Sequence, residues 1–169
     1  MRYLPIFKNI QDRPCLVVGG GPVAQRKIHM LLRAQATVTV IAPLATDDLH
    51  QWHRDGRMAF QARAFREQDI DGYALVFSAT GIKAVDQAVS EAAKKAGIPV
   101  NVVDAPALSD FIMPAIVDRS PVVVAVSTAG AAPVLARQIR AAIEALLPAD
   151  LGRLAKSAET LRDTIRDRF

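Results

Sequence analysis

Cysteine is nearly absent from this chain of 169 residues, which contains only Cys15. With one cysteine the chain can form no internal disulfide and can assemble no thiolate metal cage from its own residues. Cys15 opens the apolar run Cys15–Val18, where nothing nearby would clearly activate a thiol. A small buried strand residue is therefore the better interpretation of this position, and a nucleophile is the weaker one.

Aromatic residues are also scarce, at 5%, and the basic residues are scattered rather than clustered. The net charge of +4 permits anionic partners such as nucleotide phosphates, carboxylate-rich metabolites or nucleic acid. Because no stretch combines grouped Arg and Lys with stacking rings, nucleic acid is the weakest of these three classes.

Long apolar runs are missing as well. The longest, around Val122–Val126, is far too short to cross a bilayer, so no membrane span is predicted. The first ten residues lack a basic stretch followed by an apolar core and a small-residue cleavage site. We therefore expect no export signal and a cytoplasmic location.

Histidine is limited to His29, His50 and His53. His50 and His53 lie one turn apart on an expected helix, but no third ligand has suitable spacing. We predict no metal site made by protein side chains and expect solvated or packing roles for all three.

Short β-branched runs alternate with longer helical patterns through the first hundred residues, which is typical of βαβ units and predicts an α/β fold with a parallel sheet. The expected strands are Cys15–Val18, Thr37–Ile41, Met58–Gln61, Leu75–Ser78 and Val100–Val103, and the expected helices are Val23–Arg33, Asp47–Arg54 and Lys83–Ala96.

The pattern changes after Val103. Two strand-like runs, Ala115–Val117 and Val122–Ser127, flank the turn-like residues Asp118–Pro121, which predicts an antiparallel hairpin. One amphipathic helix is expected from Pro133, and a second helix is expected after Pro148 that continues to Phe169.

A glycine-rich turn lies between the first expected strand and helix, where residues 19–24 read GGGPVA and match the pattern G-x-G-x-x-A. Gly19 permits a tight turn, Gly21 lets the main chain approach a pyrophosphate, and Ala24 allows close packing of helix and strand. Free backbone N–H groups and the helix dipole would then face the phosphate. A glycine turn with a purely structural role is the alternative.

The acidic residue that often holds the adenosine ribose after the second strand is missing, since Ala42, Pro43 and Leu44 occupy this bend. Asp47 and Asp48 come too far along the chain to replace it. No Arg follows the strand directly either, so NAD is a better expectation than NADP.

Small residues follow the fourth expected strand. Ser78, Ala79 and Thr80 come at the carboxyl end of the sheet, where ligands bind in folds of this kind, and they leave room for a cofactor. A plain strand-to-helix connection with Thr80 as the N-cap is an equally good interpretation.

Asp104 follows the fifth expected strand and should lie on the same edge as the glycine turn. A carboxylate beside a bound cofactor can act as the general base of a dehydrogenation, taking a proton while hydride leaves toward nicotinamide. A turn-forming Asp is the alternative, and Asp110 and Asp118 fit that role better.

The chain resembles siroheme synthase through several motifs in the same order: LPIF, VVGGGPVAQRK, NVVDAP, FIMPAIVDRSPVVVAVSTAGAAPVLARQIR and LLPADLG. The resemblance covers essentially the whole chain and is closest to the N-terminal half of the long bacterial enzyme that also carries a uroporphyrinogen-III methyltransferase domain, which is absent here. It implies an NAD-binding Rossmann domain over residues 1–113, a dimerisation region over 114–147 in a homodimer, and the start of a small helical domain over 148–169.

The resemblance further implies NAD-dependent oxidation of precorrin-2 to sirohydrochlorin, followed by insertion of Fe²⁺, a substrate, to give siroheme. Asp104 matches the catalytic Asp of the family. By motif match, Pro22, Val23, Pro43 and Leu44 correspond to NAD-contacting positions of the family. The expected cofactor contacts are these four together with Gly19, Gly20 and Gly21 of the turn and with Ser78, Ala79 and Thr80. Thr128 stands where relatives often carry Ser, and Arg119, Arg137 and Arg140 are candidate contacts for the tetrapyrrole.

Two other functions fit parts of the sequence. A Rossmann domain with a dimerising helical tail could be a non-catalytic module that senses NAD. A dehydrogenase for a small hydroxy or amino acid fits less well, because we find no catalytic Lys and no His–carboxylate pair.

Overall fold

The computed structural model describes residues 1–166. The chain forms two compact units. One comprises Leu4–Ile112, and the other comprises Met1–Tyr3 together with the described residues from Met113 onward.

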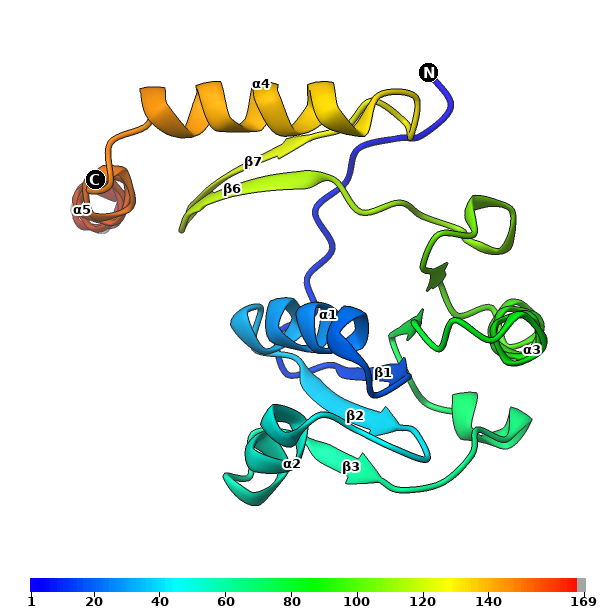
Figure 1. Cartoon of the computed structure of the whole chain (residues 1–169). Helices are drawn as coiled ribbons and strands as arrows, with labels where there is room; N and C mark the ends of the chain where they lie inside the picture. The colour runs from blue at the N-terminus through cyan, green and yellow to red at the C-terminus, as the bar shows by residue number, and fades with distance from the viewer. Residues whose placement is uncertain (167–169) are drawn as a thin grey trace. The chain divides into compact units, whose positions relative to one another are not determined.

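The first unit is built on a five-stranded parallel sheet, which confirms the predicted α/β class (Figure 1). Its strands lie in the order β3-β2-β1-β4-β5. They are β1 (Pro14–Val18), β2 (Thr37–Ile41), β3 (Ala59–Gln61), β4 (Leu75–Ser78) and β5 (Val100–Val102). The chain crosses from the β3 edge to the other side of β1 when it forms β4, so the topological switch point of this fold lies between β1 and β4.

Helices cover both faces of this sheet. They are α1 (Pro22–Arg33), α2 (Asp47–Arg54) and α3 (Lys83–Lys95), and the short 3₁₀ helices η1 (Glu67–Ile70) and η2 (Pro106–Leu108) were not predicted. One core packs alternate strand residues such as Leu16, Val18 and Val76 against Val89 and Ala93 of α3. Since side chains alternate along a strand, the remaining buried residues of β1 point to the opposite face, which α1 covers.

Cys15 has the buried position that its sequence context predicts, with no exposed surface. Burial raises the pKa of its thiol to about 11, against a small opposing effect of the Lys8 charge. We therefore expect iodoacetamide at pH 8 to leave the native protein unmodified and to alkylate Cys15 once urea unfolds it, as mass spectrometry would measure. Rapid alkylation of the native protein would contradict this burial.

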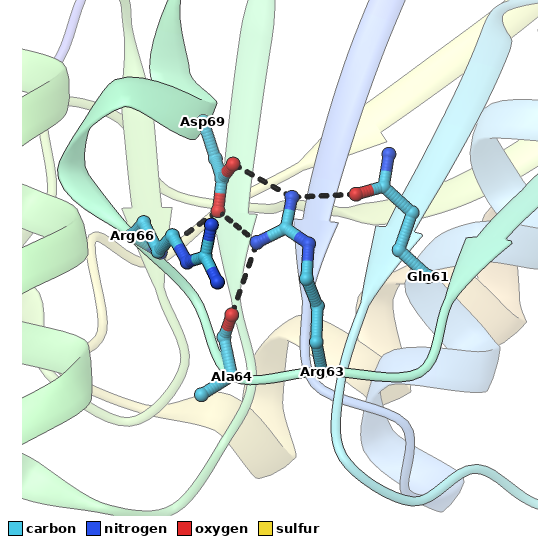
Figure 2. Close-up of polar contacts among 5 residues, drawn as sticks. All are labelled: Gln61, Arg63, Ala64, Arg66 and Asp69. Atoms are coloured by element: carbon cyan, nitrogen blue, oxygen red, sulfur yellow. Dashed lines mark hydrogen bonds and ion pairs between the residues drawn. The ribbon is translucent and has the colours of Figure 1, made fainter.

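A bidentate ion pair holds the loop between β3 and η1 (Figure 2). The Arg63 guanidinium donates to both carboxylate oxygens of Asp69, from Nη1 to Oδ2 over 2.6 Å and from Nη2 to Oδ1 over 2.7 Å. It also donates to Oε1 of Gln61 and to the Ala64 carbonyl, while the backbone N–H of Arg66 donates to Asp69. The pair thus joins the end of β3 to η1.

We expect Asp69→Asn to lower the free energy of unfolding by about 1–2 kcal/mol, because Arg63 loses its charged acceptor. Its hydrogen bond to Arg63 holds the pKa of Asp69 below the ordinary carboxyl value, despite the opposing effect of burial. The stabilisation is therefore present above that ordinary value and is lost as pH falls through the lowered pKa.

Urea unfolding of wild type and Asp69→Asn between pH 8 and pH 3 would measure this effect. The difference between the two proteins should be constant down to about pH 5 and should shrink below about pH 4. Asp71→Asn is a matched control, since Asp71 is exposed on the same loop. A difference that persists unchanged at pH 3 would contradict a charged pair.

The second unit consists of a hairpin and two helices. Strands β6 (Ala115–Arg119) and β7 (Val122–Val126) pair antiparallel, as predicted, and α4 (Pro133–Leu146) packs along both (Figure 1). The predicted four-residue turn at Asp118–Pro121 is wrong in length. Arg119 pairs with Val122, so only Ser120 and Pro121 form the connection. Asp118 belongs to the strand, and its carboxylate accepts from the Ser120 N–H and hydroxyl.

The last helix, α5 (Leu151–Arg166), begins against the tip of the hairpin. A Cβ at Gly152 would collide with the Ser120 carbonyl oxygen and lie 2.7 Å from that of Arg119. Glycine is therefore required here for close packing. The predicted continuation of this helix to Phe169 includes residues 167–169, which lie outside the described residues. Within residues 1–166, none of the helices is long and apolar enough to span a membrane.

Candidate functional site

The carboxyl ends of four strands meet at one level of the sheet. Val18 of β1 pairs with Ile41 of β2 and with Ser78 of β4, and Ser78 in turn pairs with Val102 of β5. The segments that leave the sheet beyond this row are the glycine turn, the Pro43–Leu44 bend, the Ala79–Thr80 loop and the loop with Asp104. The structure thus brings the residues predicted to bind the cofactor and the predicted base to the same edge.

The three glycines of the turn have different physical roles. Gly19 has a φ of 126°, and a Cβ there would lie 2.5 Å from the Ala79 carbonyl oxygen. A Cβ at Gly20 would collide with the Leu44 carbonyl oxygen, so this glycine too is required by the fold. A Cβ at Gly21, the N-cap of α1, would meet nothing within 4 Å. Of the three glycines, only Gly21 therefore has open space where a side chain would begin.

This open space suits a pyrophosphate. The N–H groups in the first turn of a helix have no acceptor within the helix, and the helix dipole adds positive potential at this end. Pro22 occupies the first position of α1, where its missing N–H removes no helical hydrogen bond. The residues present thus fit the phosphate groups of a dinucleotide, with a cradle over Gly21 that a side chain would fill.

Hydrogen bonds tie the bend after β2 to the glycine turn. The Thr46 N–H donates to the Gly20 carbonyl over 3.0 Å, and its hydroxyl donates to Oε1 of Gln25 on α1. Pro43 and Leu44 lie between, and the Leu44 side chain is 85% exposed. An adenosine ribose at this bend would meet an apolar side chain and backbone groups rather than a carboxylate.

Ser78 is completely buried, so its hydroxyl is turned away from the open edge. It donates to Oδ1 of Asp86 over 2.6 Å, and the Thr80 hydroxyl donates to the same oxygen over 2.8 Å. Thr80 also accepts from the Ile82 N–H, but Ile82 and not Thr80 is the N-cap of α3. Asp86 therefore fixes the loop against which Gly19 packs.

Asp104 is exposed at the end of β5 and has a φ of 58°, in the left-handed region that non-glycine residues rarely adopt. Asp tolerates this region better than most side chains, but the conformation still stores strain, and strain of this kind is found disproportionately at functional sites. In a Rossmann sheet, the β4–β5 side of the switch point receives the nicotinamide half of a dinucleotide. Asp104 lies on that side.

The residues predicted to contact the tetrapyrrole all belong to the second unit. Arg119 and Arg140 converge on Glu144, with N–O distances of 3.7 and 2.6 Å. The Thr128 hydroxyl accepts from the Ala132 N–H just before α4, and Arg137 is exposed on that helix.

Among the described residues, Arg119 Nε is a buried donor without a hydrogen-bond partner. Arg119 also lines a hollow of about 460 Å³ with two further cations, Arg153 and Lys156.

Sequence reasoning missed Asp86 and Lys27 in this region, and it assigned Gly20 to the cofactor without its packing role. Gly20 and Asp86 shape the loops, and Lys27 of α1 interacts electrostatically with Asp104. The sequence places Asp86 in the first turn of a helix, but its burial and its two donors appear only in the structure. Nothing in the spacing of Lys27 relates it to a residue 77 positions away.

The three histidines make ring contacts: His29 with Trp52, and His50 and His53 with Phe60. Within residues 1–166, no group of three or more His, Cys, Asp and Glu side chains is placed to hold a metal ion.

Comparison with known proteins gives consistent matches along the chain. Residues 6–115 match a family described as "Putative NAD(P)-binding", and residues 119–146 match one described as "Sirohaem biosynthesis protein central". Siroheme synthase of Nitrosospira multiformis is 51% identical over all of this chain, and that of Methylococcus capsulatus is 52% identical over 98% of it. The chain spans only 37% and 35% of the length of these two relatives.

A solved structure named SirC, precorrin-2 dehydrogenase, is also similar. It superposes with a TM-score of 0.76 at 25% sequence identity, covering 91% of this chain and 76% of that chain.

Proposed function

Because this chain belongs to the siroheme synthase family, we propose that it oxidises precorrin-2 to sirohydrochlorin with NAD and then helps to insert Fe²⁺ to give siroheme. The observation that carries the proposal is the common edge of the sheet, where the open cradle at Gly21 and the carboxylate of Asp104 lie on either side of the switch point. The similarity to a protein named precorrin-2 dehydrogenase supports it.

The oxidation removes two hydrogen atoms from the tetrapyrrole. They leave as one hydride, which carries both electrons, and one proton. NAD supplies the hydride acceptor when bound. Asp104 takes the proton, since its exposed carboxylate is at the β4–β5 side of the edge and is free of hydrogen bonds to the rest of the described chain. The first turn of α1 binds the phosphates and so orients the cofactor.

Chelation needs a base at the same place. Fe²⁺ replaces two pyrrole N–H protons. Asp104 accepts them one at a time and releases each to water before the next is taken. The ligands of the iron are the nitrogens of the tetrapyrrole. One carboxylate can therefore serve both steps in sequence.

The substrate carries carboxylates around its rim, and the second unit offers cations for them. We assign this role to Arg119, Arg137 and Arg140, with Thr128 supplying a hydroxyl. The buried, unpartnered Nε of Arg119 and the cationic hollow beside it support an anionic ligand. We further propose that residues 114–147 form the dimer contact of a homodimer, that residues 1–113 and 148–169 form the other two domains, and that the protein acts in the cytoplasm.

The deciding experiment mixes the protein with NAD and precorrin-2 and follows the absorbance of NADH and of sirohydrochlorin. The proposal requires both to appear together in equal amounts, and addition of Fe²⁺ should then convert the sirohydrochlorin spectrum to that of siroheme faster than without protein. If NAD binds but neither product forms, the better function is a regulatory module that senses NAD.

A further inference from the structure

Lys27 is a half-buried lysine on α1 to which neither the fold nor the proposed reaction yet assigns a role. Within the part of the chain that the structure describes, its ammonium group forms no hydrogen bond and no ion pair. Its Nζ lies 6.0 Å from the ring centroid of Phe77, at the outer limit of a cation–π contact. A lysine in such surroundings has given up part of its hydration without gaining a close anionic partner.

The position of Lys27 relates it to the carboxyl edge. Side chains on a helix lean toward its N-terminus, which for α1 is the glycine turn at that edge. Phe77 is the last residue but one of β4, and it pairs with Asn101 of β5. Asp104 follows three residues later. Lys27 therefore extends from α1 over the end of β4, the strand next to the one that leads to Asp104.

The charge of Asp104 acts on the ammonium group of Lys27. Burial, followed by the neighbouring positive charge of Arg26, lowers the pKa of Lys27, while the negative charge of Asp104 raises it. Arg26 on α1 and Asp104 after β5 are the two charged groups that act on this ammonium, and Phe77 of β4 adds no charge. Since burial dominates, the ammonium group depends on Asp104 for a compensating charge.

We propose that Lys27 is a positioning residue for Asp104: its ammonium group attracts the carboxylate without touching it and offsets the negative charge that a carboxylate-rich tetrapyrrole brings to this edge of the sheet. This inference rests on the proposed function, because it presumes that Asp104 is the base. Without the lysine, a polyanionic substrate and an anionic base would repel each other more strongly.

Three variants test the role of the charge. Lys27→Met keeps the length and apolar stem of the side chain. It should lower kcat/KM for precorrin-2 by about tenfold or more at neutral pH, where Lys27 is charged, and the difference from wild type should shrink at alkaline pH. Lys27→Arg should restore most of the rate. Arg26→Met removes a charge from the next position of the same helix and should leave the rate at pH 7 unchanged.

The pH profile separates a charge effect from a packing effect. In the wild type, kcat/KM should fall at alkaline pH as Lys27 loses its proton, earlier than an ordinary lysine would because its pKa is lowered. In Lys27→Arg this fall should move to higher pH by about one unit or more, since guanidinium stays charged. In Arg26→Met the alkaline fall in kcat/KM should also move to higher pH, because Arg26 lowers the pKa of Lys27. This displacement should be smaller than that in Lys27→Arg.

A second measurement does not depend on turnover. Reductive methylation with ¹³C-formaldehyde gives NMR signals for each lysine, and the Lys27 signal is identified by its loss in Lys27→Arg. Asp104→Asn should lower the titration midpoint of Lys27, because it removes the compensating negative charge. Asp12→Asn should leave the midpoint unchanged.

These outcomes distinguish the inference from the function on which it rests. Wild-type kcat/KM in Lys27→Met, or a Lys27 titration that does not respond to Asp104→Asn, would overturn the pairing while leaving the dehydrogenase proposal standing. A wild-type protein that forms no sirohydrochlorin would overturn the proposed function, whatever the lysine titration gives. NAD affinity should be the same in wild type and Lys27→Met.

Discussion

Asp104→Asn is expected to lower the rate of precorrin-2 oxidation by about 10²–10⁴-fold, the range that a general base contributes. Asn is close to Asp in size, tolerates the left-handed backbone conformation at this position, and cannot accept the proton. NAD affinity and the midpoint of thermal unfolding should stay near the wild-type values. Stopped-flow measurement of NADH formation, with NAD titrated separately by calorimetry, would test both statements.

Asp12 provides a closely matched control for this substitution. It too is an exposed Asp with a positive φ, 56° against 58° for Asp104, but it precedes β1 and so lies at the amino end of the sheet. Asp12→Asn should oxidise precorrin-2 at the wild-type rate. If Asp104→Asn also turned over normally, Asp104 would have no part in the chemistry, and if both variants lost activity the effect would come from the backbone conformation rather than from the site.

Gly21→Asp is expected to weaken NAD binding by roughly 100-fold or more, because a carboxylate would occupy the phosphate position at the start of α1. The fold should tolerate the change. A Cβ at Gly21 meets nothing within 4 Å, and its φ of −84° is available to any residue. Far-UV circular dichroism and thermal unfolding should therefore match the wild type while calorimetry records the loss of affinity.

Gly20→Ala should behave in the opposite way. Its Cβ would collide with the Leu44 carbonyl, so we expect the free energy of unfolding to fall by about 1–3 kcal/mol before any ligand is considered. Comparison of Gly20→Ala with Gly21→Asp therefore distinguishes a glycine needed for stability from a glycine needed for NAD binding. Unchanged NAD affinity in Gly21→Asp would remove the pyrophosphate from this turn.

Much of the first unit could be predicted from the sequence because its parallel strands are short, β-branched and followed by turn residues. The strands and helices of Leu4–Ile112 end within one or two residues of the expected positions. Asp104 was predictable for the same reason, since a polar residue directly after a buried strand must lie at the carboxyl edge.

Other features depend on contacts that no local pattern contains. The collision at Gly20 arises from the Leu44 carbonyl, 24 positions away, and the hydrogen bonds of Ser78 and Thr80 converge on Asp86 one helix turn into α3. The length of the turn at Ser120–Pro121 was overestimated because Asp118 is a common turn residue. Here it belongs to β6, and its carboxylate accepts a hydrogen bond from the turn. Such cases follow from tertiary packing rather than from propensity.

The attachment of the bend after β2 to the glycine turn restricts how the coenzyme preference of this protein could be changed. The carbonyl of Gly20 accepts from Thr46, and its Cα packs against the main chain at Leu44, so the path of residues 42–46 is part of the wall that shapes the phosphate cradle. An insertion in this bend, made to introduce an arginine for a 2′-phosphate, would disturb pyrophosphate binding as well. Redesign toward NADP would have to keep the backbone as it is and exchange side chains alone, with the exposed Leu44 as the natural position to begin.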